Sequence, residues 1–289
     1  MRALHFLLCG MLAAMPLATA CGDDDDDDTG GEGEGEGEGE GEGEGEGEGE
    51  GEGEGENPCP ACTGENCISM QVFDYRTNAP VADGSGLIAQ VYDALAGPPP
   101  VVIADNIPIE GGCIVVNDLA ATEGGPVRIV AITDPEGGDD NAAFTANDTT
   151  PGNEGVPCCS FPAYVLMAAD RDAYNDSLGY AAGEGLEDAG AWIGRVVDAD
   201  GVPMADATVT NSGNDETTAS YFMDDMSAID EDLTATLTTG ASGAWVVKNS
   251  TDGFQLAIFS ARNPGGDTFG EGGGGTLPGQ ITAVTIMAQ

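Results

Sequence analysis

A run of thirteen Gly-Glu pairs, from Gly31 to Glu56, constrains what this chain can fold into more than any other feature. The run follows a block of like charge, Asp23–Asp28, and the whole stretch has no apolar side chain to bury. Burial therefore cannot offset the conformational entropy that folding would cost. Glycine disfavours the helix, and the glutamates repel one another. We predict that residues 21–56 form a disordered acidic tether; a low-complexity insert without a role is the alternative, and it predicts disorder as well.

A secretory signal precedes the tether. Arg2 supplies a positive charge, Leu7–Leu17 is an apolar stretch too short to span a bilayer, and Ala18-Thr19-Ala20 is a small-residue cleavage site. We therefore assign residues 1–20 to a signal peptide. Leu17–Cys21 resembles the lipobox of bacterial lipoproteins, which implies lipidation at Cys21 and attachment to a membrane. Since Gly22 rather than Asp follows the cysteine, we expect the outer membrane or the cell surface. Cleavage without lipidation, which would release a soluble protein, is the alternative.

The cysteine count supports the lipid anchor. Of eight cysteines, Cys9 leaves with the signal and Cys21 would carry the lipid. The other six are Cys59, Cys62, Cys67, Cys113, Cys158 and Cys159. An even set in an exported protein predicts disulfides.

The pairing of these six cysteines is open among fifteen possibilities. We expect the segment Cys59–Cys67 to be bonded across the first domain to Cys113, Cys158 and Cys159. The C-x-x-C spacing of Cys59 and Cys62 is also found in redox and zinc sites. We favour structural disulfides, because Pro58 and Pro60 suit an extended strap.

The charge balance excludes one class of partner. The chain has 52 acidic residues, of which 19 lie in the tether, and 7 basic residues, of which Arg2 leaves with the signal. The remaining 33 acidic and six basic residues make the part after the tether strongly acidic. Such a surface cannot neutralise phosphates, so we expect no nucleic-acid partner. Cations and basic surfaces fit better.

Most catalytic motifs are missing from the sequence. The only histidine is His5, in the signal, and the only lysine is Lys248. Ser-His-Asp and Cys-His catalysis and histidine-ligated zinc are thereby excluded from the mature chain. We predict no catalytic residues, no cofactor and no enzymatic activity. Chemistry by a pair of carboxylates is the remaining enzyme hypothesis, and the sequence selects no particular pair.

The chain beyond the tether has an all-β pattern. Short segments rich in β-branched residues alternate with Gly, Asn, Asp and Pro, which predicts strands and turns. The expected strands fall into two sets: Ser69–Tyr75, Leu87–Tyr92, Cys113–Asn117, Val127–Thr133 and Tyr164–Ala168, and then Trp192–Asp198, Ala207–Asn211, Ala244–Lys248, Gln255–Ala261 and Ile281–Ala288. No long segment has helical periodicity, although Val91–Leu95 or Ala173–Tyr180 would allow a turn or two.

The two sets of strands are similar in sequence and in order. VFDYRTNAPVAD resembles VVDADGVPMAD, GCIVVN resembles GAWVVK, VRIVAITDPEGGDD resembles FQLAIFSARNPGGDT, and FPAYVLMAA resembles LPGQITAVTIMAQ. We therefore predict two tandem β-domains, 57–170 and 191–289, with residues 171–190 as a linker. Each copy is long enough to bury a core of its own.

The second copy resembles a carboxypeptidase regulatory-like domain. The resemblance rests on IGRVVDADGVPMADATVT followed by TTGASGAWVV and FQLAIFSA. It implies a transthyretin-like β-sandwich of the Greek-key type. It also implies a non-catalytic accessory or surface module, of a kind sometimes grouped with carbohydrate-binding-like folds.

The physics of this motif predicts its local structure. In Val196–Gly201 the aspartates can accept backbone N–H groups, and Gly201 tolerates a positive φ. Pro203 suits the edge of a strand. Ala207, Val209 and Asn211 share one face of a strand.

Two further features have alternative interpretations. We expect Trp245 in the core, with a sugar-stacking platform as the alternative. The acidic loops contain weak calcium candidates without EF-hand spacing, and solvated loops are the alternative. The principal calcium candidates are Asp134, Glu136, Asp139 and Asp140, and others are Asp224, Asp225 and Asp230–Asp232.

These expectations together describe a non-enzymatic lipoprotein of the cell envelope that displays two β-domains for surface binding or adhesion to a protein or glycan. A structural spacer and a carbohydrate-binding accessory module are the alternatives. A glycan binder needs accessible aromatic rings, an enzyme needs a cleft with two carboxylates, and a spacer needs neither.

Overall fold

The computed structural model describes residues 59–64, 66–93, 96, 100–119, 127–135, 141–149, 162–211 and 219–288. The signal peptide, Cys21 and the tether lie outside these residues. The described elements are β1 (Ile68–Asp74), β2 (Ile88–Asp93), β3 (Val101–Pro108), β4 (Cys113–Val116), β5 (Arg128–Thr133), β6 (Thr145–Thr149), β7 (Ala163–Val165), α1 (Ala168–Ser177), α2 (Leu186–Ala189), β8 (Ala191–Val197), β9 (Thr208–Asn211), β10 (Ser220–Tyr221), α3 (Glu231–Thr236), β11 (Ala244–Lys248), β12 (Gln255–Arg262), β13 (Thr268–Thr276) and β14 (Ile281–Met287).

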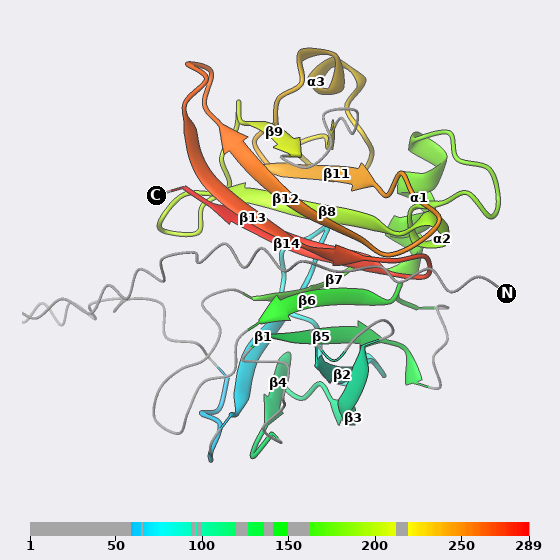
Figure 1. Cartoon of the computed structure of the whole chain (residues 1–289), viewed down its shortest axis with the longest axis vertical. Coiled ribbons are helices and arrows are strands. Elements are labelled where there is room, and N and C mark those ends of the chain that lie inside the picture. The colour runs from blue at the N-terminus through cyan, green and yellow to red at the C-terminus, as the bar shows by residue number, and fades with distance from the viewer. Residues whose placement is uncertain are drawn as a thin grey trace, which may run out of the picture. The chain divides into compact units, whose positions relative to one another are not determined.

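The strands form three sheets, so the predicted all-β class is confirmed (Figure 1). The largest has eight strands in the order β10-β11-β8-β14-β6-β5-β2-β3, and the other two are β4-β1-β7 and β13-β12-β9. Each of the ten segments expected to be strands overlaps one. The structure adds β3, β6, β10 and β13, which the sequence pattern did not predict.

The pairing of the strands repeats between the two halves of the chain. β1 pairs with β4 in the antiparallel and with β7 in the parallel direction, and β8 pairs in the same way with β11 and β14. β5 pairs antiparallel with β2 and β6, as β12 does with β9 and β13. The four sequence matches therefore coincide with four matching sets of strands.

The two halves also match in individual backbone hydrogen bonds. In the first half, Val81 N–H donates to the Val72 carbonyl and Val72 N–H donates to the Gly112 carbonyl. In the second half, Met204, Val196 and Gly243 make the same two bonds. Both glycines have a positive φ, 72° and 63°, and a Cβ there would lie 2.9 Å or less from a backbone oxygen. Only glycine satisfies both conditions without strain.

The two halves also share structure. β14 from the second half pairs in parallel with β6 from the first, which makes the eight-stranded sheet continuous (Figure 1). The described residues of both halves accordingly belong to one compact unit. One buried apolar cluster draws side chains from both halves, including Tyr75, Tyr164, Ile193 and Phe222.

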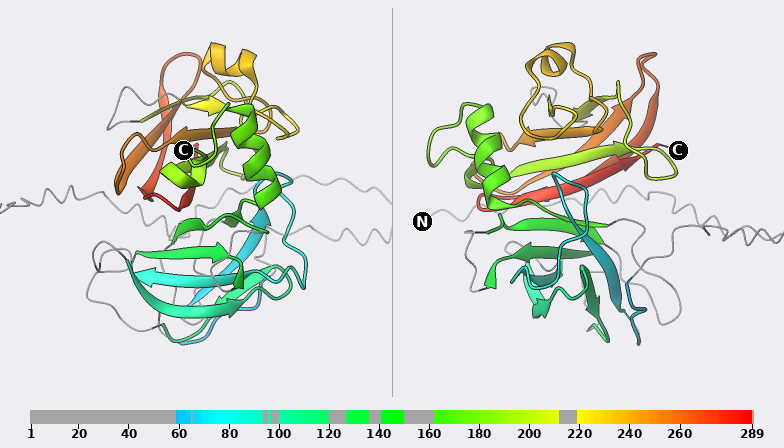
Figure 2. Two further views of the ribbon diagram at one scale, coloured as in Figure 1. Left: turned by 90° about the vertical axis from the view of Figure 1, so that its right-hand side faces the viewer. Right: turned by 180° about the vertical axis from the view of Figure 1, so that it is seen from behind.

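The segment expected to be a linker contains helices. α1 and α2 lie within or next to residues 171–190, and their Tyr174 and Leu186 are fully buried in the shared cluster. Figure 2 shows the start of α1 beside the turn after β1, where Arg76 donates to Asp170 at 2.7 Å. The helical turn expected in Ala173–Tyr180 is confirmed as far as Ser177. The turn expected in Val91–Leu95 is not, because Val91–Asp93 belongs to β2, and residues 94 and 95 lie outside the described residues. In the described part of the chain, no helix is long and apolar enough to cross a lipid bilayer.

Each half also has a core of its own. One buried cluster consists only of first-half residues and another only of second-half residues, among them Trp192, Trp245 and Phe259. Trp245 is 0% exposed, which confirms the core prediction and excludes it as a sugar platform. Ala207, Val209 and Asn211 are buried on one face, as the alternation predicts.

The motif that follows β8 has the predicted local structure. Asp198 accepts backbone N–H groups from Asp200 at 3.0 Å and Val202 at 2.8 Å. Gly201 has φ 79°, and Pro203 forms an isolated bridge with Val197.

Two disulfides are present among the described residues. Cys59 is bonded to Cys113 across 54 residues, as expected for the strap. Cys62 is bonded to Cys67, so the expectation that both would reach across the domain is wrong. These two cysteines are five positions apart in the sequence, and their Cα atoms lie 5.7 Å apart. Cys158 and Cys159 lie outside the described residues.

Candidate ligand pocket

An apolar pocket lies on the outer face of the first-half sheet. Strand register places Val102, Tyr92, Ile129 and Asp148 side by side on this face, one from each of β3, β2, β5 and β6. The neighbouring positions Val91 and Val130 point the other way and are fully buried in the first-half core. Alternation along the strands thus assigns Tyr92 and Ile129 to the outer face.

The pocket is small and mostly apolar. It encloses about 200 Å³ and is lined by Tyr92, Pro100, Ile129, Phe144, Leu277, Gly279 and Gln280. The rings of Tyr92 and Phe144 meet edge to face, with centroids 6.2 Å apart, and both side chains are half-buried. Leu277–Gln280 is the turn between β13 and β14, so the second half closes one side of the pocket.

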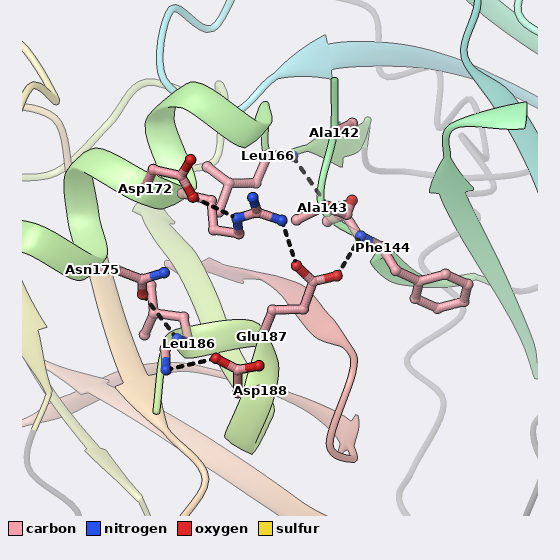
Figure 3. Close-up of polar contacts among 12 residues, drawn as sticks. Ala142, Ala143, Phe144, Leu166, Asp172, Asn175, Leu186, Glu187 and Asp188 are labelled. Atoms are coloured by element: carbon pink, nitrogen blue, oxygen red, sulfur yellow. Dashed lines mark hydrogen bonds and ion pairs between the residues drawn. The ribbon is translucent and has the colours of Figure 1, made fainter. Parts of the chain in front are cut away.

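The backbone of Phe144 is held in place by a hydrogen bond to a side chain of α2. Glu187 on α2 accepts the backbone N–H of Phe144 at 3.2 Å and also accepts from Arg171 of α1 at 2.8 Å. Figure 3 shows the ring of Phe144 pointing away from Glu187. The ion pair therefore fixes the backbone of Phe144 and leaves its ring for the pocket.

The charged side chains around α1 and α2 surround a second, polar pocket of about 470 Å³. Their hydrogen bonds are made within the protein: Asn175 accepts from Leu186 N–H, and Asp188 from Gly185 N–H (Figure 3). Burial lowers the pKa of Arg171, but hydrogen bonds to Glu187 and Asp172 outweigh this and keep the pKa above its ordinary value. We interpret this cluster as the support of Phe144 rather than as a binding site.

Asp148 stands at the end of the row that lines the apolar pocket. Its side chain is exposed, and its carboxylate has no hydrogen bond or ion pair with any described residue. The surrounding protein nevertheless disfavours the charged form, and this desolvation raises the pKa to about 6. An unpaired carboxylate with a raised pKa is a reason to look for a ligand.

A groove of about 350 Å³ on the other side of Asp148 contains a second carboxylate, Glu271. Glu271 Oε1 accepts from Ser260 at 3.2 Å. Tyr164 and Thr285 also line this groove. Asp148 and Glu271 both line this groove, which gives it the two acids that the hypothesis of carboxylate chemistry requires.

The calcium candidates that the structure describes have structural roles. Asp134 accepts from Asn141 N–H at 2.7 Å, from the Asn141 amide at 3.1 Å and from Ala142 N–H at 3.3 Å. Asp224 accepts from Ala241 N–H, Asp225 from Ser227, and Asp230 caps α3. Glu136, Asp139 and Asp140 lie outside the described residues. Within the described ranges, no three acidic, cysteine or histidine side chains are grouped to hold a metal.

Sequence reasoning did not single out Tyr92, Phe144 or Asp148. The alternation in Leu87–Tyr92 was a usable signal, since it puts Tyr92 opposite to the buried Val91. Phe144 and Asp148 flank or belong to β6, whose sequence, TANDT, has no strand pattern. No protein-family model matches the chain, and no curated protein sequence matches it.

Proposed function

We propose that this protein is a non-enzymatic lipoprotein of the cell envelope that presents two tandem β-sandwich domains of the Greek-key, carboxypeptidase regulatory-like kind for binding to a surface ligand. The lipid on Cys21 would attach it to the membrane, and the acidic tether of residues 21–56 would hold the domains away from it. The repeated strand pairing supports the domain assignment. The disulfides Cys59–Cys113 and Cys62–Cys67 support an oxidising compartment.

One observation carries the binding function: the aromatic pair Tyr92–Phe144 lines a half-open apolar pocket and is supported from behind by Glu187. Two rings kept partly accessible to water, while Trp192 and Trp245 are buried completely, favour a binding protein over a spacer.

The first experiment is the intact mass of the protein purified from membranes, before and after reduction and alkylation. We expect a chain that begins at Cys21 with a diacylglycerol-type adduct, and six further cysteines that are alkylated only after reduction. Cys21→Ser is the matched control and should be found in the soluble fraction. An unlipidated wild-type chain, or thiols that react without reduction, would contradict the proposal.

The second experiment concerns binding. Lipidated wild-type protein on liposomes is tested against arrayed peptides and glycans and against isolated envelope, with Phe144→Ala as the comparison. Binding by the wild type supports a display function. A wild type that binds none of these surfaces would contradict the display function and favour the spacer.

Hydrolysis by two carboxylates is a second candidate, and the groove with Asp148 and Glu271 is the observation that favours it. A protonated acid near neutral pH beside an ionised one is the usual arrangement of glycoside hydrolases. Turnover of a panel of aryl glycosides that is lost in both Asp148→Asn and Glu271→Gln would support this candidate. Absence of turnover in the wild type would exclude it for those substrates.

A further inference from the structure

We propose that the apolar pocket takes a single aromatic or branched aliphatic side chain from a cationic protein segment, and that Asp148 pairs with a Lys or Arg of the same segment. This inference rests on the proposed binding function and names the class of its ligand. Three observations support it: the size of the pocket, the hydrogen bonds that its polar side chains already make, and the unpaired carboxylate of Asp148 next to it.

The size of the pocket fits one side chain. Its volume of about 200 Å³ lies below the range of about 300–1,000 Å³ for sites that enclose a whole small molecule. A pocket of this size is typical of the anchor positions in protein interfaces, where one large side chain supplies much of the affinity. The 45% exposed Val102, next in the row, extends the apolar surface beyond the pocket.

The side-chain hydrogen-bond donors of the pocket are already in use, which argues against a sugar. The hydroxyl of Tyr92 donates to Gln90 at 2.7 Å. The amide of Gln280 donates to the Gly275 carbonyl at 3.2 Å and to the Thr282 hydroxyl at 2.9 Å. A sugar ring would have to bury hydroxyl oxygens without matching side-chain donors, which is costly. An apolar side chain has no such cost.

The charge around the pocket selects a cationic partner. Asp148 lies directly across from Ile129 in the β5–β6 register, so its Cβ stands about one strand spacing, roughly 5 Å, from that of the pocket residue Ile129. The nearby Asp105 is bonded to the amide of Gln90 at 2.7 Å. Since the part of the chain after the tether has 33 acidic and six basic residues, a second copy of this chain would be repelled and a basic segment attracted. The basic residue should follow or precede the apolar one by one or two positions.

The test uses the full mature protein and a set of nine-residue blocked peptides. The central residue is Trp, Leu or Ala, and the residue two positions later is Lys, Gln or Glu. Binding is measured by fluorescence anisotropy in low salt, with a chitin oligosaccharide as the competing sugar probe. We expect the Trp-Lys and Leu-Lys peptides to bind at least about tenfold more tightly than the Ala-Lys peptide. The sugar should not compete.

Variants separate the two parts of the site. Phe144→Ala should weaken the Trp-Lys peptide by about tenfold or more, and Phe144→Leu, which keeps an apolar lining, by less. Asp148→Asn should weaken the Trp-Lys peptide severalfold and leave the Trp-Gln peptide unchanged. Phe254→Ala is the control, because Phe254 is 59% exposed and does not line the pocket. The melting curve of each variant checks that it is folded.

Three results would overturn the inference: equal binding of Ala-centred and Trp-centred peptides, no effect of either Phe144 variant, or displacement by the sugar. If the wild type is lipidated and binds surfaces but the peptides fail, the inference about the ligand fails and the proposed function stands. If the wild type is unlipidated with free thiols, the proposed function fails, whatever the peptides do.

Discussion

Arg195 donates a hydrogen bond from Nη2 to the backbone carbonyl of Tyr75 at 2.6 Å, although 120 residues separate them. Its guanidinium also lies 5.3 Å from the centre of the Tyr75 ring, and Nη1 donates to the Ser242 carbonyl at 2.9 Å. In return, the Tyr75 hydroxyl donates to the carbonyl of Gly194 at 2.8 Å. This buried contact fastens the end of β1 to β8, and it connects the halves in addition to the pairing of β6 with β14.

The first prediction concerns this connection. Tyr75→Phe should lower the free energy of unfolding by about 1–2 kcal/mol, because the buried Gly194 carbonyl loses a donor that water cannot replace. Urea denaturation measures the change. Tyr164→Phe is the matched control: its hydroxyl contacts Asn78 at 3.4 Å in a partly buried place, so we expect a smaller loss. Equal losses in the two variants would contradict the role of Tyr75.

The second prediction compares Glu187 and Asp172, two carboxylates that form ion pairs with Arg171. Glu187 and Arg171 have side chains 16% and 14% exposed, whereas Asp172 is 65% exposed. Glu187→Ala should cost about 2 kcal/mol of unfolding free energy, because it removes the acceptor of Nη1 of the largely buried Arg171 and that of the Phe144 N–H. Asp172→Ala should cost less than about 0.5 kcal/mol. If Asp172→Ala is as harmful as Glu187→Ala, the helices are held in another way.

The sequence pattern predicted the strands in which apolar residues alternate. It missed the strands whose residues are explained only by contacts with other strands. β11 was predicted to the residue, since AWVVK is apolar and β-branched. β13, TFGEGGGGT, has no strand pattern, and its glycines are explained only by its neighbour: a Cβ on Gly270 or Gly272 would lie 2.3 or 2.7 Å from a carbonyl oxygen of β14. That close approach cannot be read from β13 alone.

The pocket was beyond prediction for the same reason. Tyr92 and Ile129 belong to strands that the pattern predicted, but their meeting with Leu277 depends on the turn that closes the second half over the first. The sequence pattern showed that the halves are alike. It contained no signal for the parallel pairing of Ile281–Ala283 with Thr145–Asn147, which joins them.

The third prediction tests the close approach of β13. Gly272→Ala would place a Cβ 2.7 Å from the Thr285 carbonyl oxygen, so the backbone of β13 or of β14 would have to move. We expect a loss of about 2 kcal/mol or more, as for an overpacked core. Gly253→Ala is the control, because no atom lies within 4 Å of its Cβ position; its effect should be within about 1 kcal/mol of zero. Thermal unfolding of both variants measures the two changes in stability. An unchanged stability of Gly272→Ala would refute the packing argument.

The fourth prediction is a pH dependence that belongs to Asp148. Desolvation raises its pKa in the folded protein from 3.8 to about 6. As the pH rises from about 4 to about 6, the unfolded chain releases this proton first, so ionisation favours unfolding and the free energy of unfolding falls. Asp148→Asn cannot ionise and should therefore be more stable than the wild type above pH 6, with the advantage vanishing near pH 4. Because the side chain is exposed to solvent, we expect an advantage on the order of 1 kcal/mol or less.

Urea midpoints of wild type and Asp148→Asn at pH 4, 5, 6 and 7.5 give this difference directly, and titration of the other acidic groups largely cancels between the two proteins. A difference that does not change with pH would mean that Asp148 loses its proton at the same pH in both states. A saturating concentration of a cationic peptide ligand should reduce the advantage of Asp148→Asn at pH 7.5, since the ligand stabilises the charged carboxylate of the wild type and not the amide. If the ligand leaves the advantage unchanged, Asp148 does not contact it.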